Sequence, residues 1–278
     1  MRIQHNVAAL NAANKLKAND NAISKNIAKL SSGYRINSAA DDAAGLAVSE
    51  KMRSQINGLN QAEDNAQNGI SLVQTAEGGL NETEAILQRM NTLAVESANG
   101  VYEDGTNTDR GNLQAEVTAL ISEIDRIAGS TNFNNINLLN GNLATTALTL
   151  QIGSDNVEAQ QITLNISNMT AASLGVADLS VGTQGDAQSA IDTIKTAIQN
   201  VTAQRANLGA LQNRLEHASN NLSTMSENLT SAESSIRDVD MSDEYVQYSK
   251  NQILSQAATA MLAQANTAPQ NVLTLLKG

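Results

Sequence analysis

The sequence predicts a mainly α-helical fold: a long antiparallel helical bundle or coiled coil with a small β-hairpin region and a discontinuous terminal helical domain built from both chain ends. Three observations support it. Apolar residues recur in alternating steps of four and three, the 278 residues contain one Pro, and aromatic residues make up 2%. Such spacing gives one apolar seam along a slightly under-wound helix. Scarce Pro permits long helices, and an aliphatic core suits close helix packing.

The first predicted element is an amphipathic helix over residues 3–34, which the cluster Ser31-Ser32-Gly33 ends. Two adjacent acids, Asp41 and Asp42, lie in the connector that follows. We expect them to cap the next helix and to complement its positive N-terminal end. No His or third acid lies nearby in the sequence, so metal or acid–base chemistry is the weaker interpretation.

A long helix is predicted over residues 43–99, and a loop follows at Asn99-Gly100 and Gly105. A shorter helix with apolar residues from Leu113 to Ile127 then ends at Gly129. The long helix has a heptad ladder, consisting of Met52, Leu59, Ala66, Val73, Leu80, Leu87 and Ala94.

The stretch of residues 131–185 differs in character, being rich in Thr, Asn, Gly and Ser. Alternating apolar and polar residues at 148–152 and 162–166, with Gly153 and Asn156 between them, predict a β-hairpin or small sheet.

A second long ladder runs over residues 190–239, where fourteen of fifteen 4-3 positions are apolar and Gln204 is the exception. Fifty helical residues would span about 75 Å. A helix of this length with one apolar seam needs a partner, and the heptad ladder of residues 43–99 supplies it.

The C-terminal end is predicted as a polar joint over residues 237–248, a helix over 249–265, and a break at Pro269. Apolar stripes at both chain ends should fray unless they pair with each other or with other copies. The expected domains are therefore residues 1–40 plus 240–278, and a helical rod of residues 41–239 that contains the β region.

The net charge is −11, with +5 on residues 1–40 and −1 on residues 240–278. A basic end on an acidic body could bind nucleic acid or the acidic surface of a neighbour. Scattered charges and a single aromatic residue, Tyr34, make nucleic acid the weaker choice. No apolar run is long enough to span a membrane. The N-terminus has no apolar signal core, so we expect either a cytoplasmic protein or export by a route that reads no such signal.

The sequence does not favour an enzyme. His5 and His217 are the only histidines, Cys is absent, and no phosphate-binding loop, serine elbow or zinc motif is present. Asp238 and Asp240 alone are too sparse for calcium. We therefore expect no catalytic residue, no cofactor and no metal.

Several long motifs stand out in the two parts of the chain that flank the β region. They are Leu30-Ser31-Ser32-Gly33-Tyr34-Arg35-Ile36-Asn37, Asp41-Asp42-Ala43-Ala44-Gly45-Leu46-Ala47, Gly69 to Gly78, Ile236 to Met241, Ala260 to Asn266, and Pro269-Gln270-Asn271-Val272-Leu273. These motifs resemble those of the bacterial flagellin family. They occur at both ends in the family's order, and the resemblance covers roughly residues 1–140 and 186–278.

The resemblance implies a subunit that self-assembles into the flagellar filament for motility, with the terminal helices pairing as an inner coiled coil. The chain resembles a short form of flagellin, because the large variable outer domains of many flagellins are nearly missing from it. It also implies type III export without a cleaved signal, an extracellular location, and an export chaperone on the C-terminal helix. The export apparatus, cap and junction proteins would be further partners. Two alternatives remain: a flagellin-like hook–filament junction protein, and a secreted helical enzyme.

Two sets of residues are expected to carry function. The family segment that vertebrate Toll-like receptors read resembles residues 87–95, which keep Arg89 and Leu93 but have Asn91 and Thr92 where an Arg-Glu pair is usual; Glu116 matches a further contact. Filament assembly is assigned to apolar residues of the two ends: Ile3, Val7, Leu10, Ile23, Ile27, Leu30, Ile253, Leu254, Met261 and Leu262.

Overall fold

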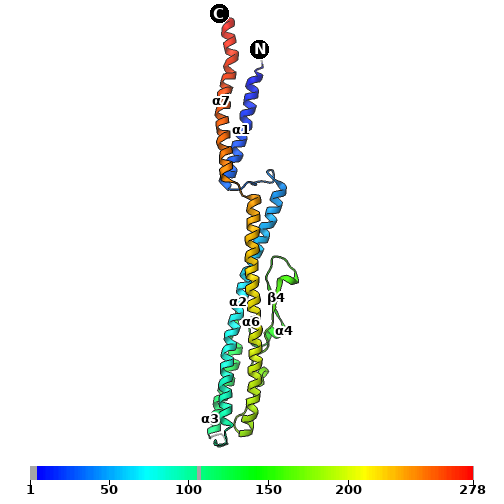
Figure 1. Ribbon diagram of the computed structural model, residues 1–278, viewed down its shortest axis with the longest axis vertical. Helices are drawn as coiled ribbons and strands as arrows, with labels where there is room; N and C mark the ends of the chain where they lie inside the picture. Colours follow the sequence, from blue (N-terminus) through cyan, green and yellow to red (C-terminus); the bar gives the residue numbers. More distant parts are fainter. Residues whose placement is uncertain (1–4, 105–107, 278) are drawn as a thin grey trace. The chain divides into compact units, whose positions relative to one another are not determined.

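The computed structural model describes residues 5–104 and 108–277, with the side chains of residues 268–277 left aside. The described chain is mainly helical, as predicted (Figure 1). It forms two compact units: a central unit of Asn57–Ser226, and a terminal unit of the residues up to Ile56 together with those from Glu227 onward. The helices are α1 Val7–Ser32, α2 Ala43–Ser97, α3 Asp109–Ser130, α4 Asn142–Thr145, α5 Ala171–Leu174, α6 Gln184–Arg237 and α7 Met241–Lys277.

The boundaries of the two units lie inside α2 and α6, so each unit contains part of both helices. The boundaries expected from the sequence, at residues 40 and 240, lie instead in the connectors between α1 and α2 and between α6 and α7. A helix that continues through a boundary has no Pro, Gly or Ser cluster to mark it in the sequence.

Within the central unit α2 and α6 run antiparallel. Ser226 Oγ donates to Asn60 Oδ1 at 2.7 Å, and Arg205 Nη1 donates to Glu84 Oε2 at 2.5 Å. Gln184 Nε2 donates to the carbonyl of Ala98 at 3.1 Å. The partner numbers fall on one helix as they rise on the other, so the two ladders predicted from the sequence are paired.

The core of the central unit forms where these two ladders pack against α3. Leu80, Leu87 and Val117 are completely buried. The ladder of α6 is buried at most positions up to Leu222, but Met225 is 45% exposed. The 4-3 pattern alone did not show where burial along this helix ends. The buried ladder residues of α6 are Ala190, Ile194, Ala197, Val201, Gln204, Leu208, Leu211, Leu215 and Leu222.

Gln204, the one polar residue of the α6 ladder, is buried at 5% exposure. Its Oε1 accepts from the backbone N–H of Ser167 at 3.5 Å, and its Nε2 donates to the carbonyl of Asn165 at 3.4 Å. A buried amide that satisfies otherwise unpaired backbone groups can fix the register of a helix at some cost in stability. Gln204 thus joins α6 to the segment that follows the second strand of the hairpin.

The predicted hairpin is present as β3 Leu148–Gln151 and β4 Gln161–Leu164, which pair antiparallel with Leu148 opposite Leu164. The 3-10 turn η1 Glu158–Gln160 lies between them. Ile162 and Leu164 enter the core. The hairpin lies close to α2 at Gly69, where a Cβ atom would lie 2.7 Å from Leu150 Cδ1. Gly69 therefore allows the close approach of strand and helix.

A second, two-residue hairpin was not predicted. It pairs β1 Asn132–Phe133 with β2 Ile136–Asn137 through Asn134 and Asn135, which both have positive φ. Asn tolerates this left-handed region better than most residues. The signal in the sequence was the Asn-Asn pair between two apolar residues.

The connector between α1 and α2 shows that the two adjacent acids have different roles. Asp42 Oδ1 accepts from the backbone N–H of Gly45 at 2.9 Å, which confirms the expected cap. Asp41 Oδ2 instead accepts from the backbone N–H of Ser38 at 3.0 Å and from its hydroxyl at 2.9 Å. The Ser38 hydroxyl and backbone hydrogen bonds hold the pKa of Asp41 below its ordinary value.

Two predictions about the C-terminal end were wrong. Residues 241–248 are the first turns of α7 and not a polar joint, because Asp240 caps them: its Oδ1 accepts from the N–H groups of Ser242 at 2.9 Å and Asp243 at 3.2 Å. Nor does the helix break at Pro269, since α7 continues to Lys277. The carbonyl that Pro269 leaves without a helical donor, that of Ala265, accepts a hydrogen bond from Asn6.

Candidate assembly interface

The helices α1 and α7 of the terminal unit run antiparallel and side by side (Figure 1). Half-buried or buried residues recur at 3-4 spacing on both helices and define what we call the terminal seam. On α1 they are Ala9, Ala12, Leu16, Asn19, Ile23, Asn26 and Leu30. On α7 they are Glu244, Tyr248, Asn251, Ser255, Ala258, Leu262 and Ala265.

Polar contacts run along the terminal seam. Asn19 Nδ2 donates to the carbonyl of Asn251 at 2.5 Å, and Ser255 Oγ donates to Asp20 Oδ1 at 3.0 Å. Lys29 Nζ lies 3.8 Å from Glu244 Oε2. The α7 side of the seam has one large aliphatic residue, Leu262. The two helices are therefore joined by amide, hydroxyl and charged groups, with small residues and a few large aliphatic ones between them.

Asn26 is the one buried residue of α1. With its amide oriented so that both atoms have partners, its nitrogen donates to Glu244 Oε1 at 3.1 Å and its oxygen accepts from Asn251 Nδ2 at 3.2 Å. A buried Asn at a helix–helix contact favours one register, because other registers leave the amide unpaired.

At the end of the pair nearest the connectors, residues 33–36 meet residues 237–239. The backbone N–H of Arg35 donates to the carbonyl of Arg237 at 2.7 Å, and that of Val239 donates to the carbonyl of Gly33 at 3.0 Å. The Arg237 guanidinium lies 4.7 Å from the ring centre of Tyr34 and 2.7 Å from Glu50 Oε1. These contacts hold the two connectors together.

The predicted assembly residues divide between two faces. Ile23, Leu30 and Leu262 belong to the terminal seam, and Ile3 lies outside the described residues. The remaining six are off the seam and exposed: Val7 at 57%, Leu10 at 62%, Ile27 at 49%, Ile253 at 66%, Leu254 at 48% and Met261 at 66%.

A groove of about 500 Å³ lies between α1 and α7. Its floor is made of small side chains, and larger apolar side chains flank it. Lys15 adds its aliphatic stem and a positive charge. The lining residues are Lys15, Ala18, Asn19 and Ala22 of α1 with Leu254, Ala257, Ala258 and Met261 of α7.

The three residues assigned to receptor binding lie in the central unit and differ in exposure. Arg89 Nε donates to Glu116 Oε1 at 2.8 Å, and their side chains are 55% and 42% exposed. Leu93 is 1% exposed and packs in the core. On the folded subunit Arg89 and Glu116 can therefore touch a partner directly, while Leu93 supports the helix that carries Arg89.

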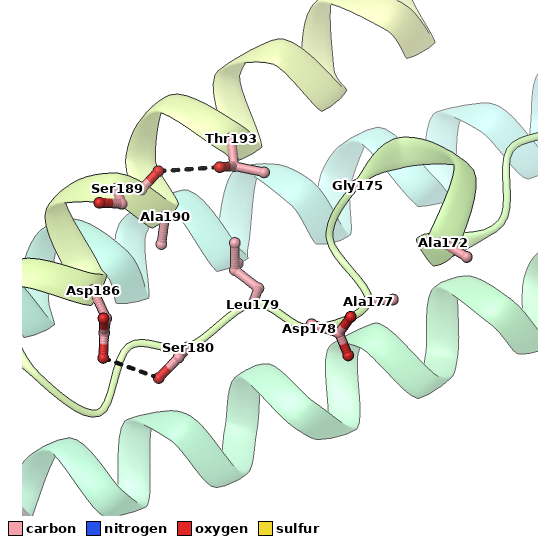
Figure 2. Close-up of a pocket in the computed structure, with 10 residues that line it drawn as sticks. All are labelled: Ala172, Gly175, Ala177, Asp178, Leu179, Ser180, Asp186, Ser189, Ala190 and Thr193. Atoms are coloured by element: carbon pink, nitrogen blue, oxygen red, sulfur yellow. Dashed lines mark hydrogen bonds between the residues drawn. The ribbon is translucent and has the colours of Figure 1, made fainter.

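A second hollow, of about 410 Å³, lies between the loop after α5 and the start of α6 (Figure 2). Asp178 and Asp186 line it together with hydroxyl groups, and Ser180 Oγ donates to Asp186 Oδ2 at 3.5 Å. Over the described residues no group of three His, Cys, Asp or Glu side chains is placed to hold a metal ion.

None of the helices described in the structure is both long and apolar enough to cross a membrane.

Three polar residues that organise the structure have structural roles that were not predicted from the sequence. Asn6 contacts the far end of α7. Asp240 could have been found as an acid followed by Asp243 and Glu244, a common start of a helix. Arg110 is 3% exposed and fixes the loop before α3, because its Nε donates to the carbonyl of Ser97 at 2.8 Å and its Nη2 to that of Asn99 at 2.8 Å.

The fold therefore defines a class: proteins of long antiparallel helices whose two chain ends form a separate helix pair. Residues 3–144 match the family described as bacterial flagellin N-terminal helical region, and residues 191–276 match the bacterial flagellin C-terminal helical region. The chain belongs to the bacterial flagellin family. It is thus a structural protein and not an enzyme.

Individual relatives agree with this assignment. The flagellar filament 30.7 kDa core protein of Treponema maltophilum is 50% identical over 291 residues, covering 99% of this chain and 100% of the relative. The flagellin of Bacillus subtilis (strain 168) is 51% identical over 307 residues and 100% of both chains. The putative flagellar hook-associated protein from Vibrio parahaemolyticus shares the fold alone, with a TM-score of 0.56 at 15% identity over 71% of this chain and 100% of that chain.

Proposed function

We propose that this chain self-assembles into the flagellar filament through the outer faces of α1 and α7. The observation that carries this is the position of six large apolar side chains on those helices, off the terminal seam and about half or more exposed. Exposed apolar residues that adjoin an apolar groove are typical of interaction surfaces.

The groove offers space between small side chains, and large apolar side chains are exposed on the outer faces. The small residues Ala18, Ala22 and Ala257 leave space between the helices. Large side chains such as Ile253 and Leu10 stand on the outer faces. Inserting such a side chain from one copy into the groove of another would remove apolar area from water in both.

The remaining partners are those that membership of the flagellin family implies. An export chaperone on the C-terminal helix would cover Ile253, Leu254 and Met261 before assembly. Passage through the flagellar type III apparatus without a cleaved signal would then deliver the subunit to the extracellular filament, where cap and junction proteins meet its ends.

The sharpest test fills the groove. Ala18→Leu should raise the critical concentration for polymerisation at least about tenfold, because a groove closed by its own helix cannot accept a neighbour. Ala119→Leu is the matched control, since Ala119 is exposed on α3 of the central unit and does not line the groove. Both subunits should keep the helical circular dichroism of the unsubstituted chain. Normal polymerisation of Ala18→Leu would contradict the proposal.

The same experiment separates a filament subunit from a hook–filament junction protein. A filament subunit polymerises from purified chains into long fibres, which negative-stain electron microscopy shows directly. A junction protein would stay short or monomeric and would bind only at the ends of filaments made by another flagellin.

A second function, recognition by a vertebrate Toll-like receptor, is favoured by the exposed Arg89–Glu116 pair. Arg is prominent among residues that dominate binding energy. We expect Arg89→Ala to weaken receptor binding about tenfold. Arg126→Ala is the matched control, because Arg126 also forms an exposed pair, with Glu123. Equal binding by the two variants would contradict this assignment. Replacing Asn91 by Arg and Thr92 by Glu should strengthen binding.

A further inference from the structure

Asn6 joins the beginning of α1 to a point near the end of α7. Its Oδ1 accepts from the backbone N–H of Ala9 at 3.0 Å, so it is the N-cap of α1. Its Nδ2 donates to the carbonyl of Ala265 at 2.8 Å, across 259 residues of sequence. Both polar atoms of one half-buried amide are thus used, one on each helix.

The carbonyl of Ala265 has no backbone donor four residues further along α7. In an α-helix each carbonyl accepts from the N–H four residues further on, and four residues after Ala265 stands Pro269, which has no N–H. A proline inside a helix normally costs about 3 kcal/mol or more, in part because of this missing hydrogen bond. Nevertheless α7 continues through Pro269 to Lys277.

We propose that Asn6 is the register-determining residue of the terminal helix pair, and that it acts by supplying the hydrogen bond that Pro269 cannot. The carbonyls inside α7 accept from a backbone N–H of the helix, and that of Asn251 accepts from Asn19 in addition. The proline marks one free acceptor, and Asn6 bonds to that one. Sliding α1 by one turn would leave the Ala265 carbonyl and the Asn6 amide unpaired together.

Asn6 also differs from the other polar residues of the terminal seam. Asn19 donates to the carbonyl of Asn251, which has a helical N–H donor in Ser255, and Asn26 pairs mainly with side chains of α7. The contact of Asn6 lies at the opposite end of the pair from the connector contacts of Arg35 and Arg237. Fixed points near both ends define the alignment of two helices better than contacts at one end.

The test is a double-mutant cycle on the full chain, read out as the critical concentration for polymerisation. Asn6→Asp keeps an acceptor for the N–H of Ala9 but loses the donor to Ala265. Pro269→Ala restores a backbone N–H four residues after Ala265. We expect Asn6→Asp to raise the critical concentration about tenfold when Pro269 is present, and by less than about twofold when residue 269 has been changed to Ala.

A general role in capping or helicity gives a different result. Pro269→Ala would then stabilise α7 in every background and leave the effect of Asn6→Asp unchanged. Equal effects in the two backgrounds, or no effect when Pro269 is present, would overturn the proposal. Asn207→Asp is the matched control, because it adds the same charge at an exposed position of α6, away from the terminal helices.

This inference rests on the proposed function only for its readout. Polymerisation of the unsubstituted chain tests the proposed function by itself. Amide hydrogen exchange over residues 241–267, measured by mass spectrometry on the same four chains, tests the coupling without filaments. Asn6→Asp should speed exchange there when Pro269 is present and much less after Pro269→Ala, and equal acceleration in both would count against it.

Discussion

The central core and the terminal seam have the same 3-4 spacing of inward-facing residues but differ in chemistry. In the core, α2, α3 and α6 meet through completely buried Leu, Ile and Val side chains such as Leu87 and Ile124. In the terminal seam, α1 and α7 meet through half-buried Asn, Ser and Ala side chains together with Leu16, Ile23, Leu30 and Leu262. Six other large apolar side chains of these helices lie off the seam and are exposed. The spacing of a pattern therefore defines a helix face, and the identity of the residues on it decides whether the pair is stable alone.

The largest expected effect separates the central core from the exposed outer face of α1 by stability. Leu87→Ala removes a completely buried side chain and should lower the free energy of unfolding by about 2–5 kcal/mol. Leu10→Ala, at a position that is 62% exposed, should change it by less than about 0.5 kcal/mol. Denaturant unfolding of the isolated subunits measures both. A similar loss in the two variants would remove the distinction between the regions.

A smaller effect is expected at the polar residue of the central core. Gln204→Leu leaves the Ser167 N–H and the Asn165 carbonyl without their amide partner. We expect a loss of about 1 kcal/mol in unfolding free energy, together with faster amide exchange after β4. Unchanged exchange over residues 165–167 would show that Gln204 does not position that segment.

Smaller still is the expected contribution of the ion pairs between α2 and α6. Arg205 lies between Glu84, at 2.5 Å, and Glu77, at 3.4 Å. Its hydrogen bond with Glu84 raises the pKa of the guanidinium above its ordinary value. Because the arginine side chain is 29% exposed, Arg205→Met should cost only about 0.5–1 kcal/mol. Raising the salt concentration should shrink the difference between the variant and the unsubstituted chain, as thermal unfolding would show.

The smallest effect concerns pH at the exposed connector. Because the Ser38 hydrogen bonds lower the pKa of Asp41 in the folded chain, their contribution is present above the ordinary pKa of Asp. It is lost as pH falls through the lowered folded value. An NMR titration should find the Asp41 midpoint below that of an unstructured peptide. Ser38→Ala should return it towards the ordinary value, and an unchanged midpoint would contradict the assigned cause.

Much of the helical architecture could be predicted from the sequence because it depends on spacing. The ladders of α2 and α6, the end of α3 near Gly129 and the hairpin of β3 and β4 follow from periodicity and turn residues. The course of α7 could not be predicted in this way. A proline usually ends a helix, because it has no backbone N–H to donate. Here the Ala265 carbonyl finds a partner in Asn6, 259 residues away in the sequence, and no local pattern indicates that contact.

The sequence predicted the assembly residues as one apolar set. It did not show that they divide between the terminal seam and the exposed outer faces of α1 and α7. Ile23 and Ile27 are four residues apart, and the sequence alone treats them alike. The structure places Ile23 in the terminal seam and leaves Ile27 49% exposed. The difference depends on which side of α1 meets α7, and that side is set by polar residues such as Asn19 and Asn26, which a search for apolar stripes passes over.

The pairing of α1 with α7 also has a kinetic consequence. Contacts between residues so far apart in the chain raise the contact order, and they form slowly because a long loop must close before they are made. During synthesis, the first helix of the chain has to wait for nearly all the rest before its partner exists. We therefore expect the pairing of α1 with α7 to be the last contact between helices to form, after the central core.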